Sequence, residues 1–318
     1  GYFTWAFRLA GLFILAFRRL GLECGPRATW QAVLLDGDCA ALQYRQPHNL
    51  SMTSISDYDI GQLLGRGGFA CVYRARQRST GHDVAIKIVV KARMAEPGMM
   101  DRIKNEIRIH SKLRHPNVVS FTGCFEDEHC VYMVLELCTH GNMFRYLKVH
   151  GPLAESVAVK VIQQLINALD YIHANGVVHR DLKLSNILLS CDMGSNSLHL
   201  VKICDFGLAF QKEHPDEEHF TLCGTPNYIA PEVVSQRSHG YPADLWSVGC
   251  LFYSMVVGTP PFERGDVKDT LSHIVSGEYR DPEISENGVD FLRSLLHLNP
   301  IKRASVRETL AHPLLSPS

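Results

Sequence analysis

The stretch that decides the fold is His179-Arg180-Asp181-Leu182-Lys183-Leu184-Ser185-Asn186, and further along the chain it is followed by Asp205-Phe206-Gly207. The two stretches supply two carboxylates, Asp181 and Asp205, and one amide, Asn186. Carboxylate and amide oxygens are the ligands that magnesium prefers, and magnesium accompanies nucleotide triphosphates. The pattern therefore predicts a site that holds a metal-bound nucleotide triphosphate.

A glycine-rich turn lies upstream, where residues 65–72 read Gly-Arg-Gly-Gly-Phe-Ala-Cys-Val. Glycines let backbone amides approach phosphates because no Cβ intervenes. Ala70 stands where a third glycine is usual, and one methyl group there should be tolerated. Such turns are common between strands, so the loop alone is weak support for nucleotide binding. Its place shortly before Lys87 strengthens the prediction.

Lys87 follows Val84-Ala85-Ile86 on a short apolar run. A lysine in a buried strand rarely lacks a partner of opposite charge. Glu106, on the helix expected next, is the predicted partner. The alternative is a surface lysine and a solvated glutamate, which would contribute little.

The hydrophobic periodicity changes character along the chain. Short β-type runs dominate the first part, whereas residues 157–174 carry apolar side chains at helical spacing. We expect strands at 58–64, 71–76, 83–89, 118–125 and 131–135, with one helix near 98–113. The pattern predicts an α+β chain with a small, mostly antiparallel lobe at 55–138, a helix-rich lobe at 139–315, and a hinge at 136–140 with the nucleotide between the lobes.

From about residue 55 onward the chain resembles eukaryotic protein kinases, since Ala230-Pro231-Glu232 completes their motif set. The resemblance implies the bilobal kinase fold. Residues 67–70, 134–138 and 221–232 look like those of polo-like kinases. Residues 98–100, 105–110, 145–148 and 184–186 are most similar to the Sak type, the fourth polo-like kinase, although residues 121–127 would also suit the mitotic polo kinase.

The resemblance assigns roles to the polar residues. Asp181 would be the base that orients the substrate hydroxyl, and Asn186 and Asp205 would bind Mg²⁺. Lys87 would align the α and β phosphates of ATP when the helix that carries Glu106 swings inward. Lys183 would reach the γ-phosphate, and a lysine at its position is typical of serine/threonine kinases.

The same resemblance gives the ATP pocket. The adenine would lie between Val72 and Ala85 on one side and Leu188 on the other. Main-chain bonds would come from Glu136 and Cys138, with Leu135 at the back. The remaining nucleotide contacts would come from the loop residues Leu64, Gly65, Arg66, Gly67, Gly68, Phe69 and Ala70.

Regulation would act on the segment 205–232. A phosphate on Thr221 could pair with Arg180 and order the loop. Thr225 is expected to bond near Asp181 and Lys183 in the substrate groove.

Two further groups would be structural. Glu232 should pair with Arg303, and Asp244 should cap the backbone of the catalytic loop. His110, His179 and Phe206 are candidates for a stacked regulatory spine.

Composition excludes some other functions. The net charge of −1 and the pI near 7.0 give no support for nucleic acid or a membrane as the main partner. The ten cysteines form no CxxC pair, which favours reduced thiols over a zinc ribbon. The resemblance to polo-like kinases, and not composition, implies the expected partners, which are ATP, proteins bearing Ser or Thr, and a second copy in trans autophosphorylation; it also implies a location in the cytoplasm and at the centrosome or centriole.

The N-terminal residues 1–54 match no kinase motif, and we expect a disordered or artefactual extension. The apolar run 9–17 between Arg8 and Arg18 is too short to cross a membrane, and a docking helix or a targeting segment is the alternative. Met52 is a plausible native start. Polo-box modules, which would localise and dimerise such a kinase, are not encoded in this chain.

Two other readings stay open. A pseudokinase would hold ATP or partners without turnover, although every catalytic position is filled. A variant tethered to a membrane through residues 1–22 is the other.

Overall fold

The computed structural model describes residues 54–68, 70–94, 98–190, 200–212, 214, 217 and 219–315. All of them belong to one unit, Met52–Ser318. The predictions for residues 1–53, including the apolar run and Met52, and the prediction for Phe69 lie outside the described residues. Within the described ranges, no helix combines the length and apolar character that crossing a membrane requires.

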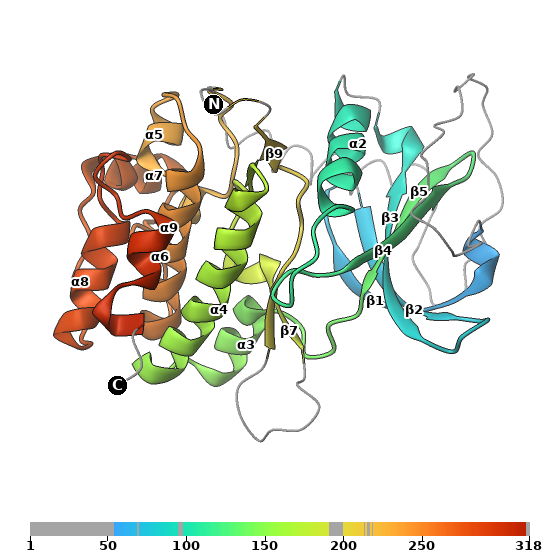
Figure 1. Ribbon diagram of the computed structural model, residues 1–318, viewed down its shortest axis with the longest axis horizontal. Helices are drawn as coiled ribbons and strands as arrows, with labels where there is room; N and C mark the ends of the chain where they lie inside the picture. Colours follow the sequence, from blue (N-terminus) through green and yellow to red (C-terminus); the bar gives the residue numbers. More distant parts are fainter. Residues whose placement is uncertain are drawn as a thin grey trace. The chain divides into compact units, whose positions relative to one another are not determined.

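A five-stranded antiparallel sheet and one helix form the first part of this unit (Figure 1). Its strand order is β1-β2-β3-β5-β4, and every pairing is antiparallel, as predicted. The elements are β1 (Tyr58–Arg66), β2 (Ala70–Gln77), β3 (Asp83–Val90), α2 (Met99–His110), β4 (Phe121–Glu126) and β5 (Cys130–Glu136).

The sheet buries alternate residues on opposite faces. On β5, Val131 and Met133 pack with α2, whereas Tyr132 and Val134 pack in a second cluster with Tyr58. Side chains of a strand alternate between its two faces with a period of two residues, and both faces of β5 are covered by a hydrophobic cluster. Gly81, at a φ of 72°, makes the turn that joins β2 to β3.

The expected strand at 118–125 is divided in the structure. β4 begins only at Phe121, while Val118 and Val119 pair with Ile203 far along the chain. The apolar run is continuous, but its first residues bond to a different partner strand. Sequence pattern cannot reveal such a change of partner.

Helices dominate the second part, and its described residues also form two short strand pairs (Figure 1). The helices are α3 (Met143–His150), α4 (Glu155–Ala174), α5 (Pro231–Val234), α6 (Tyr241–Val257), α7 (Val267–Ser276), α8 (Glu286–Leu295) and α9 (Val306–Leu310). The strands are β6 (Val177–Val178), β7 (Ile187–Ser190), β8 (Leu200–Ile203) and β9 (Phe210–Gln211).

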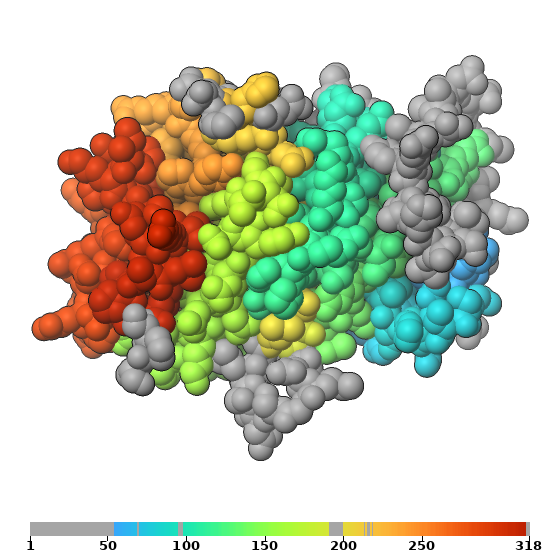
Figure 2. Space-filling model, viewed as in Figure 1, coloured from blue at the N-terminus to red at the C-terminus, as the bar shows by residue number. Residues whose placement is uncertain are grey.

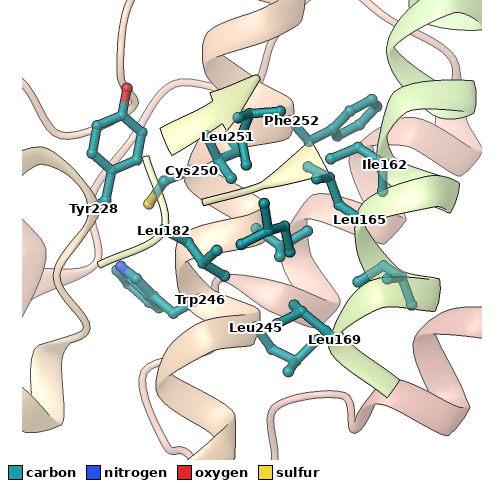
Figure 3. Packing of buried hydrophobic residues seen from close by; sticks show 14 of the residues in the cluster. Ile162, Leu165, Leu169, Leu182, Tyr228, Leu245, Trp246, Cys250, Leu251 and Phe252 are labelled. Carbon is teal, nitrogen blue, oxygen red and sulfur yellow. The ribbon is translucent and has the colours of Figure 1, made fainter. Parts of the chain in front are cut away.

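The centre of this part is α6, which is buried continuously from Ala243 to Met255. A helix apolar on all sides belongs in a core. Gly249 lets α8 approach closely, because a Cβ there would lie 2.8 Å from Leu296. Figure 3 shows side chains of α4 and α6 packed together, with Leu182 among them.

Leu182 fixes the direction of its neighbours. Its side chain is 1% exposed and belongs to the core. The adjacent polar residues, Asp181 and Lys183, do not belong to that cluster and instead pair with each other. The core therefore positions the functional side chains.

The segment after α2 contacts α4 directly. The backbone N–H of Arg114 donates to the Tyr171 hydroxyl at 2.9 Å, and the His115 ring stacks on Tyr171 with centroids 5.3 Å apart. In Figure 2, the segment after α2 (green) lies beside α4 (yellow-green) on the face in view. The helix that carries Glu106 is thus tied to the helical part through the segment that follows it.

Candidate active site

Lys87, Glu106 and Asp205 form one charged cluster. Lys87 Nζ lies 2.6 Å from Glu106 Oε1 and 3.1 Å from Asp205 Oδ1. The predicted pairing of Lys87 with Glu106 is therefore confirmed. β3 supplies the lysine, α2 the glutamate, and the turn after β8 the aspartate.

Electrostatics favour the charged forms of Lys87 and Asp205, whereas burial raises the pKa of Glu106 above its ordinary value. Burial alone would lower the pKa of Lys87, but the carboxylates of Glu106 and Asp205 outweigh it and raise that pKa above its ordinary value. Lys87 in turn holds the pKa of Asp205 below its usual value. The cluster presents a cation beside a partly exposed carboxylate, as phosphate and metal binding require.

Asp181 faces Lys183 and Thr225. Lys183 Nζ lies 2.6 Å from Asp181 Oδ2 and donates to the Thr225 hydroxyl at 3.0 Å. That hydroxyl donates to Asp181 Oδ1 at 2.7 Å. The expected position of Thr225 beside Asp181 and Lys183 is confirmed.

Asn186 completes this group from the short helical turn that follows. Its Nδ2 donates to the Asp181 carbonyl at 2.9 Å and to Asp181 Oδ2 at 3.3 Å. The amide nitrogen is thus used inside the protein, and the amide oxygen is the atom suited to a cation.

Backbone strain marks two of these positions. Arg180 and Asp205 have φ values of 65° and 68°, which residues other than glycine seldom adopt. Buried Asp244 accepts from the N–H groups of His179 and Arg180, each at 2.9 Å. The predicted cap on the catalytic loop is confirmed, and it helps to hold the strained turn.

Phe206 lies between two histidine rings. Ring centroids are 4.7 Å from His110 and 5.0 Å from His179. His110 Nε2 donates to the Val119 carbonyl at 2.7 Å, and burial lowers the pKa of His110 to about 4. A neutral imidazole therefore packs on Phe206, and the predicted stack is present.

The residues expected around the adenine come from both parts of the unit. Ala85 and Leu135 are directly opposite on β3 and β5, and Val72 is opposite Lys87 on β2. Leu188 lies on β7, next to Asn142. Glu136 ends β5, and Cys138 follows it. Burial raises the pKa of the Cys138 thiol to about 12.

The glycine-rich loop joins β1 to β2. Gly65 and Arg66 end β1 behind exposed Leu64, Ala70 begins β2, and the N–H of Gly67 donates to the Ala70 carbonyl at 2.8 Å. An added Cβ at Gly65 or Gly68 would meet no described atom within 4 Å. No described atom therefore packs against these two glycines.

The segment that carries Thr221 is exposed, and Phe220 and Leu222 on either side of it are 53% and 51% exposed. Arg180 Nε donates to the Leu208 carbonyl at 2.7 Å, and its guanidinium lies 4.7 Å from the centre of the Phe210 ring. Its Nη1 is buried and has no hydrogen-bond partner among the residues the structure describes.

Below this segment, Glu232 accepts two bonds from Arg303, at 2.7 and 2.9 Å. Both side chains are at most 3% exposed. The predicted pair is confirmed, and it anchors α5 to the segment between α8 and α9. The seven cysteines in the described part are free, as expected.

Sequence reasoning missed several contacts. Asn105 Nδ2 donates to the Ala209 carbonyl at 2.9 Å, which ties α2 to the segment after Phe206. Lys202 is 5% exposed and pairs with Glu136. Lys202 sits in the apolar run Leu200-Val201-Lys202-Ile203, so the argument used for Lys87 would also have predicted a partner for it.

Comparison with known proteins gives one family. The family described as "Protein kinase domain" matches residues 58–315. The chain is similar to proteins named "Serine/threonine-protein kinase PLK4" from Xenopus laevis, Drosophila willistoni and Danio rerio. Identities are 45%, 46% and 45% over 82%, 83% and 83% of this chain. It spans 27%, 33% and 28% of their respective lengths.

Proposed function

This chain belongs to the protein kinase family, and we propose that it transfers the γ-phosphate of ATP to serine and threonine hydroxyls of proteins. The observation that carries the proposal is the pairing of Lys87 with both Glu106 and Asp205. This arrangement puts a cation and a candidate metal ligand side by side. A structural ion pair alone would not need the second, partly exposed carboxylate.

The residues present fit a magnesium-bound triphosphate. Asp205 and Asn186 offer oxygen ligands, and Lys87 offers a point charge for phosphate. When bound, magnesium would neutralise the charge on the phosphate oxygens. The backbone N–H groups of the glycine-rich loop that joins β1 to β2 are proposed to contact the phosphates, because its glycines carry no Cβ that would keep them apart.

Asp181 is proposed to orient the acceptor hydroxyl and to accept its proton. Lys183 is proposed to stabilise charge on the group in transfer, and Thr225 holds both side chains. The similarity to relatives named serine/threonine kinases supports this acceptor class.

Activation is proposed to follow phosphorylation of Thr221, by a second copy of the chain in trans. The exposure of Thr221 supports access for another molecule. The unpartnered Nη1 of Arg180 supports this residue as a donor to the new phosphate. We expect Thr221→Ala to lower activity and Thr221→Asp to restore part of it.

We further propose a polo-like role of the Sak type, in centriole duplication and the cell cycle, with the protein in the cytoplasm and at the centrosome. Its similarity to proteins named PLK4 supports this role over that of a mitotic polo kinase. Loss of centrioles after depletion of the protein would test it.

Casein phosphorylation by the purified chain tests the catalytic proposal, with Asp181→Asn as the comparison. We expect wild-type turnover and a loss of about 10²-fold or more in the variant. Equal turnover in Asp181→Asn would remove Asp181 from the mechanism. ATP binding without turnover in the phosphorylated wild type would instead favour a pseudokinase.

A further inference from the structure

Lys202 is a buried lysine with two partners outside its own strand. Its Nζ lies 3.0 Å from Glu136 Oε1 and donates to the Pro116 carbonyl at 2.7 Å. The side chain is 7% exposed, compared with 28% for Glu136. Lys202 therefore joins three segments: β8, the loop after α2, and the end of β5.

Glu136 is held from a second direction. Its Oε2 accepts from the N–H of Ser120 at 3.1 Å, and its own N–H donates to the Ser120 carbonyl at 2.9 Å. Both carboxylate oxygens are thus engaged, one by the loop and one by Lys202. The first residue of the proposed hinge is fixed on both sides.

The same short strand also leads to the metal-ligand candidate. Asp205 follows Lys202 by three residues, and the intervening Cys204 N–H donates to the Asn186 carbonyl at 3.0 Å. Ile203 is bonded on one side to Asn117 and Val119 and on the other to β7. β8 therefore has little freedom to shift relative to either end of the nucleotide site.

We propose that Lys202 is a positioning residue for the nucleotide: it sets the span between the adenine-contacting edge at Glu136 and the phosphate end at Asp205. The inference rests on the proposed function, because it assumes that ATP lies along this span. If the span is fixed before the nucleotide binds, the site loses less conformational entropy on binding. Lys202 should therefore increase the affinity for the nucleotide and have little effect on the rate of phosphate transfer.

Lys202→Met tests the idea, and Lys91→Met is its matched control. Lys91 has the same pair of partners, a carboxylate (Glu126, 2.8 Å) and a carbonyl (Asp127, 2.6 Å), but lies just after β3, away from the hinge. We expect Lys202→Met to raise KM for ATP and the Kd for ADP about fivefold to tenfold, with kcat within about twofold. Lys91→Met should leave all three values at the wild-type level.

Two more variants separate positioning from general stability. Lys202→Arg keeps a charge and donors, and it should recover most of the affinity. Glu136→Gln keeps the bond from Ser120 and removes only the charge partner, so it tests the contact even if Lys202→Met does not fold. It should also raise the Kd for ADP, by a smaller factor than Lys202→Met does.

Hydrogen exchange of residues 136–140 provides a readout independent of turnover. Exchange should quicken in Lys202→Met and Glu136→Gln and stay unchanged in Lys91→Met. The inference is overturned if Lys202→Met and Glu136→Gln lower the melting temperature but leave hydrogen exchange of residues 136–140 and the Kd for ADP as in Lys91→Met. A rise of kcat in these two variants would also overturn it. Failure of the wild type to bind ADP or ATP would overturn the proposed function instead, and with it the inference.

Discussion

The hydroxyl of Thr225 donates a 2.7 Å hydrogen bond to Oδ1 of Asp181, although 44 positions separate the two residues along the chain. The same hydroxyl accepts from Lys183, which in turn pairs with the other oxygen of Asp181. The end of the segment 205–232, which we propose to be regulatory, is thus bonded directly to the proposed base. A change in that segment can therefore reach the Asp181 carboxylate without passing through the proposed hinge.

Thr225→Val should lower kcat about 10- to 100-fold, because it removes the bond that orients Asp181 and Lys183 while keeping a similar volume. Thr225→Ser retains the hydroxyl and should recover most of the turnover. Steady-state assays with casein and a circular dichroism spectrum of each variant would check this. Turnover in Thr225→Val equal to wild type would show that the bond does not orient Asp181.

Lys87→Met should lower kcat by about 10²- to 10³-fold, because the phosphates lose a positioning charge. The substitution also leaves Glu106 buried without its partner, which costs stability. A second change, Glu106→Gln, removes that unpaired charge. The double variant should therefore regain stability in urea unfolding but no turnover.

A different result would change the role of the pair. If Glu106→Gln restored turnover in the Lys87→Met background, the lysine would act only by neutralising Glu106. Lys91→Met serves again as the control, since its ion pair lies outside the site.

Pairs carried by recognisable motifs could be predicted from the sequence. Lys87 with Glu106 follows from residue type and order, because a buried charge needs a partner, whereas Glu232 with Arg303 follows from the resemblance to protein kinases. The alternation of β5 and the stripe of α4 also follow directly from side-chain periodicity. These predictions depend on local pattern, on the rule that a buried charge needs a partner, and on the motifs shared with protein kinases.

Other features depend on which distant segments meet. Val118 and Val119 leave the expected strand because Ile203 bonds to them, and Lys202 reaches Glu136 across the same junction. Arg180 bonds to the Leu208 carbonyl and stacks on Phe210. No spacing in the sequence encodes these contacts, since each joins segments that come together only in the folded chain.

Arg303→Met should lower the free energy of unfolding by about 3–5 kcal/mol, because it leaves Glu232 buried and unpaired. Arg303 also donates to the Pro242 and His297 carbonyls and lies 5.1 Å from the centre of the Trp246 ring. Arg303→Lys keeps the charge but loses the two-pronged bond, so it should recover only part of the stability. Urea unfolding measures both.

The exposed pair of Arg293 with Asp281 offers a control. Those side chains are 63% and 43% exposed, and water screens such pairs. Arg293→Met should leave the urea midpoint close to that of the wild type. A loss as large as that of Arg303→Met would mean that burial does not explain the effect.

Acid should destabilise the fold through His110. Its pKa falls from the usual 6.5 to about 4 on folding, because burial disfavours the cation, with Lys87, His179 and Arg114 adding to the effect. The unfolded chain therefore takes up the proton first as the pH drops below about 6.5. The contribution of His110 is complete above that pH and is lost as the pH falls toward 4. Between pH 7 and pH 5, the free energy of unfolding should therefore fall by about 2 kcal/mol because of His110.

His110→Phe keeps an aromatic ring against Phe206 but cannot be protonated. It also leaves the Val119 carbonyl without its donor, so the variant should be less stable at pH 7. Its stability should nevertheless fall less than that of the wild type between pH 7 and 5, as measured by urea unfolding at both values. An equal fall in the two proteins would show that another group takes up the proton and that the stack around Phe206 does not sense acid.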